Sequence, residues 1–281
     1  MGATPWRFES SQPHGGNVVL HSPATVAKAL RLRDEEGLDA RQTAKRLGLP
    51  AGTVRDWFAG KLPVHSRPVS NGLPPATCSA CGQRRHSLED LGPAYVHLLG
   101  LYLGDGSIAT HRRGVFRLRV SLDKKYPRIV RECAESIRGV LPENKVHALL
   151  TPSNYYSISA YSRSWPCLFP QHGPGPKHTR PIFLAGWQQR LAERWPKQLL
   201  RGLIQSDGCR FVNTGRGGWR HPRYCFSNVS TDITSIFCSA CDCLDLRWTA
   251  AFPKSETAAV AIYVSRKADV AKLDEFVGPK R

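Results

Sequence analysis

The stretch LLGLYLGDG at residues 98–106 recurs in altered form as LRGLIQSDG at residues 200–208. Each copy is a run of residues compatible with a helix, and each ends at a glycine, Gly106 in the first and Gly208 in the second. A glycine with positive φ commonly closes the last turn of a helix. The two stretches therefore predict two helices that end at these glycines.

Each predicted helix carries an aspartate in its last turn, Asp105 in the first copy and Asp207 in the second. A carboxylate there faces the negative end of the helix dipole, which costs roughly 0.3–1 kcal/mol when the carboxylate serves no other purpose. Because the same unfavourable placement occurs twice, we interpret the pair as two carboxylates held for a cation.

Small residues repeat at the same places. Gly100 and Gly104 are four residues apart, as are Gly202 and Ser206. Residues with this spacing share one face of a helix, so each helix has a stripe where another backbone can approach closely. Two such helices packed on each other would bring both aspartates to one end, which is the arrangement of a divalent-metal site suited to phosphodiester cleavage.

At these residues the sequence resembles the LAGLIDADG homing endonucleases, in the form in which one chain carries both motifs. The two aspartates are 102 residues apart, which fits one repeat of the αββαββα half of that family, and the resemblance covers about residues 92–281. The strings depart from the family two positions before each aspartate, where the family often has another acid. This chain has Leu103 and Gln205 there.

The resemblance implies an α+β fold, in which two pseudo-symmetric αββαββα repeats form a DNA-binding saddle over residues 92–180 and 181–281. It also implies that Asp105 and Asp207 are catalytic and each hold Mg²⁺ near one scissile phosphate. A basic residue near the site often assists in this family, and Lys254, in the predicted loop between the last two strands, is the candidate. Internal pseudo-two-fold symmetry predicts a monomer.

The charge of the chain agrees with a nucleic-acid partner. The formal net charge is +18, and 28 of the 40 basic residues are arginine, whose planar fork suits phosphate and guanine. Residues 91–281 hold 28 basic and 14 acidic side chains, against 12 and 8 in residues 1–90. The repeat region is therefore expected to supply most of the surface that binds double-stranded DNA.

The location of the protein is expected to be cytoplasmic and associated with the nucleoid. No stretch approaches the roughly 18 apolar residues that a membrane span requires, and the N-terminus has no pattern of a secretory signal. The sequence therefore predicts no membrane partner.

Arginines follow both motifs on predicted strands. Arg117 and Arg119 alternate with apolar residues after the first motif, so they are expected on the face of the sheet away from the core. The predicted DNA-binding residues after the second motif are Arg210, Arg216, Arg220 and Arg223. The basic, proline-rich connector at residues 170–181 adds Lys177 and Arg180, which are expected to touch phosphate.

The N-terminal part divides into three. Residues 1–22 lack periodicity and are expected to be disordered. Residues 23–61 predict three helices that resemble a helix-turn-helix of the homeodomain-like type, with Thr53 and Arg55 on the recognition helix. A plain helical bundle that contacts protein is the alternative. Residues 62–91 are a proline-rich linker that contains a possible zinc knuckle.

The knuckle consists of Cys78 and Cys81, whose two-residue gap lets both thiolates meet one Zn²⁺ ion. A structural zinc needs four ligands, and only His65 and His86 are near in sequence. Nine cysteines without a secretion signal indicate reduced thiols or metal rather than disulfides. Cys238 and Cys241 fall inside a predicted helix and are interpreted as small hydrophobic residues.

The sequence thus predicts a site-specific double-strand DNA endonuclease of the homing type, with metal-dependent phosphodiester hydrolysis. Two alternatives stay open. One is a catalytically silent DNA-binding transcriptional regulator on the same scaffold, and the other is an RNA-binding splicing assistant. Retention of both aspartates favours the nuclease.

Overall fold

The computed structural model describes residues 23–62, 81, 88–215, 218, 220–253, 255, 258–278 and 280. Several of the sequence predictions fall on other parts of the chain and so lie outside the described residues. They are the disorder of residues 1–22, the roles of Cys78, Arg216 and Lys254, and the possible zinc ligands His65 and His86. Most of the predicted linker lies outside them as well.

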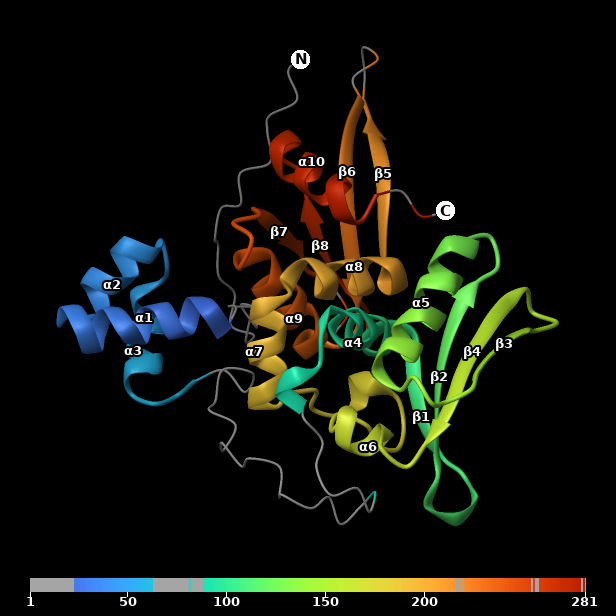
Figure 1. Ribbon diagram of the computed structural model, residues 1–281. Helices are drawn as coiled ribbons and strands as arrows, with labels where there is room; N and C mark the ends of the chain where they lie inside the picture. Colours follow the sequence, from blue (N-terminus) through green and yellow to red (C-terminus); the bar gives the residue numbers. More distant parts are fainter. Residues whose placement is uncertain are drawn as a thin grey trace.

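Two halves with the same order of elements make up the structure after residue 92 (Figure 1). The first half consists of α4 (Pro93–Asp105), β1 (Gly106–Thr110), β2 (Phe116–Asp123), α5 (Pro127–Val140), β3 (Val146–Leu150), β4 (Tyr155–Ser162) and the short α6 (Trp165–Leu168). The second consists of α8 (Pro196–Asp207), β5 (Gly208–Thr214), β6 (Arg220–Asn228), α9 (Thr231–Asp242), β7 (Trp248–Ala251), β8 (Val260–Val264) and α10 (Lys267–Phe276). Helix α7 (Gly186–Arg194) joins them.

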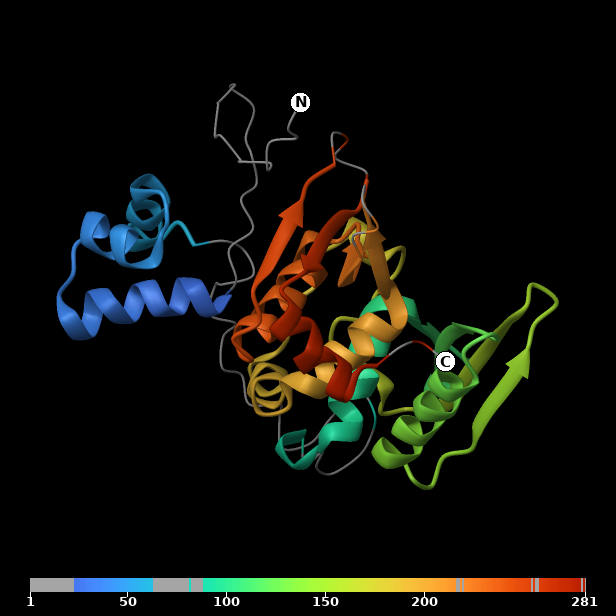
Figure 2. The same ribbon diagram turned by 90° about the horizontal axis from the view of Figure 1, so that it is seen from above.

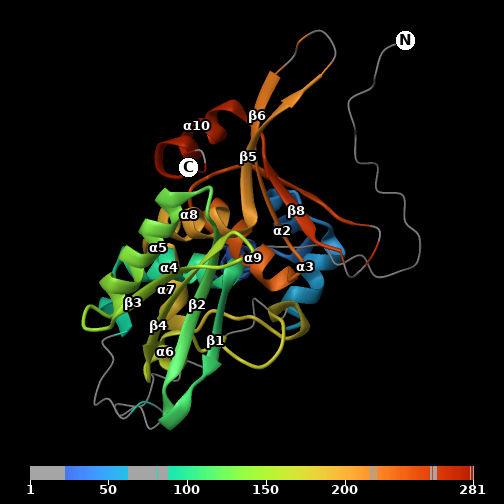
Figure 3. The same cartoon turned by 90° about the vertical axis from the view of Figure 1, so that its right-hand side faces the viewer.

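Each half contains one four-stranded antiparallel sheet, ordered β1-β2-β4-β3 in the first and β5-β6-β8-β7 in the second. Figure 3 shows the hairpins β1–β2 and β5–β6 extending in opposite directions from the middle of the molecule. The α+β fold with two repeated halves is therefore confirmed.

The first two strands of each sheet pair in the same register, counted from the glycine that follows the motif aspartate. Gly106, which follows Asp105, pairs with Val120, and Gly208, which follows Asp207, pairs with Phe226. Both Val120 and Phe226 are fully buried, because side chains on alternate residues of a strand face the helices that cover the sheet. Residues one position away in either strand therefore face the opposite, uncovered side, which we call the groove face.

Helices α4 and α8 pack against each other at the middle of the molecule, at the positions of the small residues. A Cβ atom on Gly100 would lie 2.6 Å from the carbonyl oxygen of Leu199 and 2.9 Å from Cα of Gly202. No side chain fits at this crossing, so the glycines permit direct contact of the two backbones. This contact sets the ends of both helices side by side.

A buried histidine also ties the two helices together. His97 lies 2.7 Å from Ser136 Oγ through Nδ1 and 2.7 Å from Gln205 Oε1 through Nε2. The amide nitrogen of Gln205 donates to Glu132, so its oxygen accepts from His97 Nε2–H. Burial lowers the pKa of His97, which keeps it neutral. Gln205, where the family often has an acid, thus serves the contact between the helices.

One local prediction was wrong. Gly106 and Gly208 have φ of −90° and −108°, in extended backbone rather than the left-handed region. Glycine is needed there for space, since a Cβ would lie 2.8 Å from the carbonyl oxygen of Tyr102 or 2.7 Å from Cα of Ile204. The chain passes directly from helix into strand at both places.

The helix that follows the second strand begins differently in the two halves. In the first half, Ser121 and Asp123 both lie in β2, and α5 begins later at Pro127 without a side-chain cap. In the second half, Ser230 caps α9, because its side chain accepts from the backbone N–H of Ile233.

The N-terminal helices form a small bundle to one side of the two halves (Figure 2). They are α1 (Pro23–Glu36), α2 (Ala40–Leu47) and α3 (Ala51–Phe58). Val26, Val54 and Trp57 belong to its separate core, and α1 contacts α9. Gly48, with φ of 67°, turns the chain between α2 and α3. The function of this bundle as a DNA-binding helix-turn-helix stays a prediction.

Within the described residues no helix is long and apolar enough to cross a bilayer.

Candidate metal and DNA-binding site

The two aspartates meet at one end of the α4–α8 pair. A Cβ on Gly104, the neighbour of Asp105, would lie 2.9 Å from Oδ2 of Asp207. The side chain of Asp105 is exposed and that of Asp207 is half-buried, so both are open to solvent. The close backbone contact at Gly100 and Gly202 produces this arrangement, because it brings the two helices together a few residues before the ends that carry the aspartates.

The pKa values of both carboxyl groups are raised. Desolvation by the surrounding protein and the negative charge of Asp207 raise the pKa of Asp105 to about 6. The positive charges of Lys280 and Lys177 act in the opposite direction. Burial raises the pKa of Asp207, and a 2.7 Å hydrogen bond from Asn228 acts in the opposite direction. Two carboxylates that repel each other at a solvent-open position favour a bound cation.

Lys177 lies at this site rather than on an outer surface. Its ammonium donates to the carbonyl oxygens of Gly104 at 2.7 Å and Gly106 at 2.9 Å, and also to that of Tyr102. Burial lowers the pKa of Lys177 to about 8, although the charges of Asp207 and Asp105 raise it. The sequence predicted that Lys177 touches phosphate, and the structure places it beside the two aspartates.

Lys280, which sequence reasoning missed, also lies near the aspartate pair. Its ammonium donates to the carbonyl oxygen of Ser206 at 3.1 Å, at the end of α8. Burial lowers its pKa, and the charge of Asp105 is the largest opposing effect. The repeat offset could have found it, since Lys177 follows Asp105 by 72 residues and Lys280 follows Asp207 by 73.

The predicted arginines divide between the two faces of their sheets. Arg117 and Arg119 alternate with the buried Leu118 and Val120, so both lie on the groove face. Arg223 lies on the groove face of the second sheet, and Arg220 is exposed at the start of β6.

Arg210 differs from the others. It pairs with the buried Tyr224 and therefore faces the helices. There its guanidinium donates to both carboxylate oxygens of Asp274 in α10, at 2.6 and 2.8 Å. The strand alternation thus removes Arg210 from the predicted DNA-binding set. Arg180 also makes hydrogen bonds within the protein. It donates to the carbonyl oxygen of Gln171 and makes a side-chain hydrogen bond with Tyr102.

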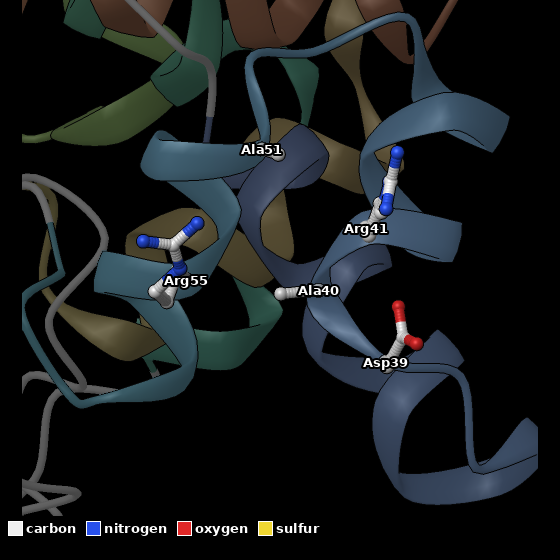
Figure 4. Close-up of a pocket in the computed structure, with 5 residues that line it drawn as sticks. All are labelled: Asp39, Ala40, Arg41, Ala51 and Arg55. Atoms are coloured by element: carbon white, nitrogen blue, oxygen red, sulfur yellow. The ribbon is translucent and has the colours of Figure 1, made fainter.

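In the N-terminal bundle, Arg55 is exposed and Thr53 is half-buried on α3. A depression at the start of α2 and α3 is lined by Asp39, Ala40, Arg41, Ala51 and Arg55. Figure 4 shows Arg41 and Arg55 on opposite sides of it, one from each helix. Two cationic groups on adjacent helices suit contact with a phosphate backbone.

The zinc prediction rests on one described ligand. Cys81 is buried, whereas Cys78, His65 and His86 lie outside the described residues. Among the residues that the structure covers, no three His, Cys, Asp or Glu side chains gather in a group that could hold a metal ion. Cys238 and Cys241 are buried in α9, where burial raises the pKa of each thiol.

Comparisons with known proteins give structural likeness alone. No family model and no curated protein matches the sequence. A structure of I-DmoI in complex with DNA and Mn is 13% identical, with a TM-score of 0.47 over 68% of this chain and 99% of that one. The N-terminal LAGLIDADG domain of DUF199/WhiA is 14% identical, with a TM-score of 0.41 over 70% and 86%.

A third similar structure is the LAGLIDADG meganuclease I-AabMI bound to uncleaved DNA, at 13% identity and a TM-score of 0.41 over 66% and 82%. The similar solved structures are LAGLIDADG homing endonucleases and a LAGLIDADG domain, the family that the two motif strings of this chain resemble.

Proposed function

We propose that this chain is a site-specific double-strand DNA endonuclease of the homing type, which hydrolyses phosphodiester bonds with Mg²⁺. One observation carries the proposal. Asp105 and Asp207 share one end of the α4–α8 pair, and a lysine from each half lies beside them. An open pair of carboxylates flanked by ammonium groups can hold both a metal ion and a phosphate.

The donor set fits a hard divalent cation. Mg²⁺ prefers oxygen ligands, keeps several of its waters and is commonly held by one or two carboxylates together with phosphate oxygens. Asp105 and Asp207 supply these carboxylates, and the mutual repulsion that raises the pKa of Asp105 would be relieved by a positive charge. Bound Mg²⁺ would polarise a phosphate and lower the pKa of water.

The residues of the chain have separate tasks in this proposal. Arg117, Arg119 and Arg223 bind DNA across the groove faces of the two sheets. Asn228 orients the carboxylate of Asp207 through its 2.7 Å hydrogen bond. Lys177 and Lys280 offset the negative charge that gathers where a phosphate meets two carboxylates, and their fixed positions on backbone carbonyls avoid reorganisation.

The second candidate function is a DNA-binding regulator that no longer cuts. The exposed Arg55 beside Arg41 on the N-terminal bundle supports a role in DNA binding that does not depend on the aspartates. The complete set of two aspartates and two lysines favours the nuclease, because a regulator has no need of carboxylates that repel phosphate.

The test compares cleavage with binding. Asp105→Asn and Asp207→Asn are nearly isosteric, so the fold and the arginine surface should persist. We expect each substitution to abolish Mg²⁺-dependent double-strand cleavage of a site selected from a random library, while affinity stays within about tenfold, roughly 1.4 kcal/mol. The control is Asp245→Asn, at an exposed aspartate with φ of 52° that asparagine tolerates. If the wild-type chain binds its selected site tightly but never cuts it with Mg²⁺ or Mn²⁺, the regulator replaces the nuclease.

A further inference from the structure

The coincident registers allow the groove faces to be compared residue by residue. Arg117 in β2 pairs with Ala109, the third residue after Gly106. Arg223 in β6 pairs with Phe211, the third residue after Gly208. The two arginines therefore occupy equivalent places in the two halves, related by the same pseudo-two-fold symmetry as Asp105 and Asp207.

These two arginines share a second property. Both are half-buried, and the Nε atom of each is buried without a hydrogen-bond partner among the described residues. The guanidinium of Arg117 lies 3.4 Å from Ser159 Oγ and 5.8 Å from the centre of the Tyr161 ring, which restricts its motion. A restricted guanidinium is suited to a ligand of fixed geometry rather than to bulk solvent.

The next pair of equivalent positions breaks the symmetry. Arg119 pairs with Ser107, directly after Gly106, whereas the equivalent residue of the second half is Cys225, which pairs with Cys209. Arg119 is exposed. The Cys225 thiol instead makes hydrogen bonds with Cys209 and Tyr263, and a thiol has no fork of N–H donors. This position lies nearer to the aspartates than that of Arg117 or Arg223.

Arginine most often reads guanine, by donating two parallel hydrogen bonds to O6 and N7 in the major groove. Two arginines related by a two-fold axis would contact guanines on opposite strands, at equal distances from the centre of the target. A position nearer to the aspartates corresponds to a base pair nearer to the scissile phosphates, and therefore nearer to that centre.

We propose that three arginines on the groove faces set the guanine preferences of the target. Arg117 and Arg223 recognise a mirrored pair of guanines, and Arg119 recognises one further guanine, nearer to the centre, that has no mirror partner because Cys225 stands at the equivalent place. The inference rests on the proposed binding of double-stranded DNA, but not on cleavage.

The experiment selects bound sequences from a random duplex library with the full chain, without divalent metal so that no DNA is cut. The wild-type chain should enrich the mirrored guanines and the single inner guanine. Arg117→Lys and Arg223→Lys keep the charge but lose the fork, so each should remove the guanine preference, about tenfold or more, in one half-site only.

The sharpest variant adds a contact. Cys225→Arg should create a preference for guanine at the mirror of the inner position and make the target more symmetric. Arg119→Cys is its reverse and should remove the inner guanine, which keeps the proposal testable if the first variant does not fold. Thermal unfolding checks the folding of both.

Several results would overturn the inference. Selected sites without mirrored guanines would do so, and so would lysine variants that bind more weakly but keep the same base preferences, because the arginines would then contact phosphate. If the wild-type chain enriches no sequence and binds no duplex, the proposed DNA function itself fails, which is a different result.

Discussion

Lys177 and Lys280 occupy equivalent places in the two halves, and each is fixed to the end of one motif helix. Lys177 donates to the carbonyl oxygen of Gly104 in α4, and Lys280 donates to that of Ser206 in α8. Each lysine interacts more strongly with the aspartate of the other half. The charge of Asp207 raises the pKa of Lys177 more than that of Asp105 does, and the charge of Asp105 raises the pKa of Lys280 more than that of Asp207 does. Each lysine thus connects the helix of one half to the carboxylate of the other.

We expect Lys177→Met and Lys280→Met each to lower the rate of cleavage about tenfold or more, because a fixed positive charge beside the phosphate is lost. DNA affinity should fall by less than tenfold, since many other cations remain. Single-turnover cleavage and equilibrium binding measure the two effects. Lys272→Met, at an exposed lysine on α10, is the matched control. Equal losses of binding and cleavage would assign the two lysines to affinity alone.

The raised pKa of Asp105 predicts a dependence of stability on pH in the metal-free protein. The folded state holds this proton up to about pH 6, whereas the unfolded chain releases it near 3.8. Between these values the folded state binds more protons, so stability falls as pH rises. Asp105→Asn should remove that fall and be more stable than wild type above pH 6.

Urea midpoints of the wild type and Asp105→Asn, measured from pH 4 to pH 7, check this prediction. His97 titrates in both proteins and cancels in the difference. Asp245→Asn should follow the wild type throughout. Parallel curves for the wild type and Asp105→Asn would show that Asp105 has an ordinary pKa.

The contact between α4 and α8 predicts a low tolerance for side chains. Gly100→Ala would place a Cβ 2.6 Å from a carbonyl oxygen and 2.8 Å from the backbone nitrogen of Leu203, neither of which can rotate away. We expect a loss of about 1–3 kcal/mol in the free energy of unfolding, and a larger loss of cleavage because the aspartates separate. Gly52→Ala in α3, where nothing lies within 4 Å, should be neutral or gain up to about 1 kcal/mol. Chemical unfolding of both variants measures the difference.

The N-terminal bundle is expected to extend the DNA contact. Deletion of residues 1–75 should weaken binding and shorten the protected region on the selected site. The linker holds the bundle at a high effective concentration near the DNA, so the bundle adds to the affinity of the two halves. Nuclease protection and cleavage assays measure this, and circular dichroism verifies that the two halves stay folded. A footprint of unchanged length would favour a bundle that contacts protein instead.

The cysteine knuckle predicts about one zinc ion per chain, held by Cys78 and Cys81 with two further ligands. Elemental analysis of freshly purified protein, never exposed to chelators, measures it. Cys81→Ser should remove the zinc, and Cys238→Ser in α9 should not. Zinc-free wild-type protein would leave these cysteines as reduced thiols.

The amino-acid sequence by itself determined the repeated architecture. The spacing of Gly100 and Gly104, the alternation from Phe116 to Val120, and the 102-residue offset between Asp105 and Asp207 are patterns of local sequence. Helix and strand periodicities place side chains on faces without reference to distant residues. The resemblance of the two motif strings to the LAGLIDADG family supplied the order of elements in each half. The same reasoning from periodicity placed Arg117, Arg119 and Arg223 on strands. The alternation with apolar residues put Arg117 and Arg119 on the face of the sheet away from the core.

Only the tertiary structure decided which charges share the aspartate site. Lys177 and Lys280 lie more than 70 residues beyond their aspartates, and the return of the chain through four strands brings them back. It also supplied the partner of Arg210, because the acceptor Asp274 comes from a helix at the far end of the chain. Ion pairs and pKa shifts depend on distances of a few ångströms between remote segments, and such distances exist only after the two halves have packed.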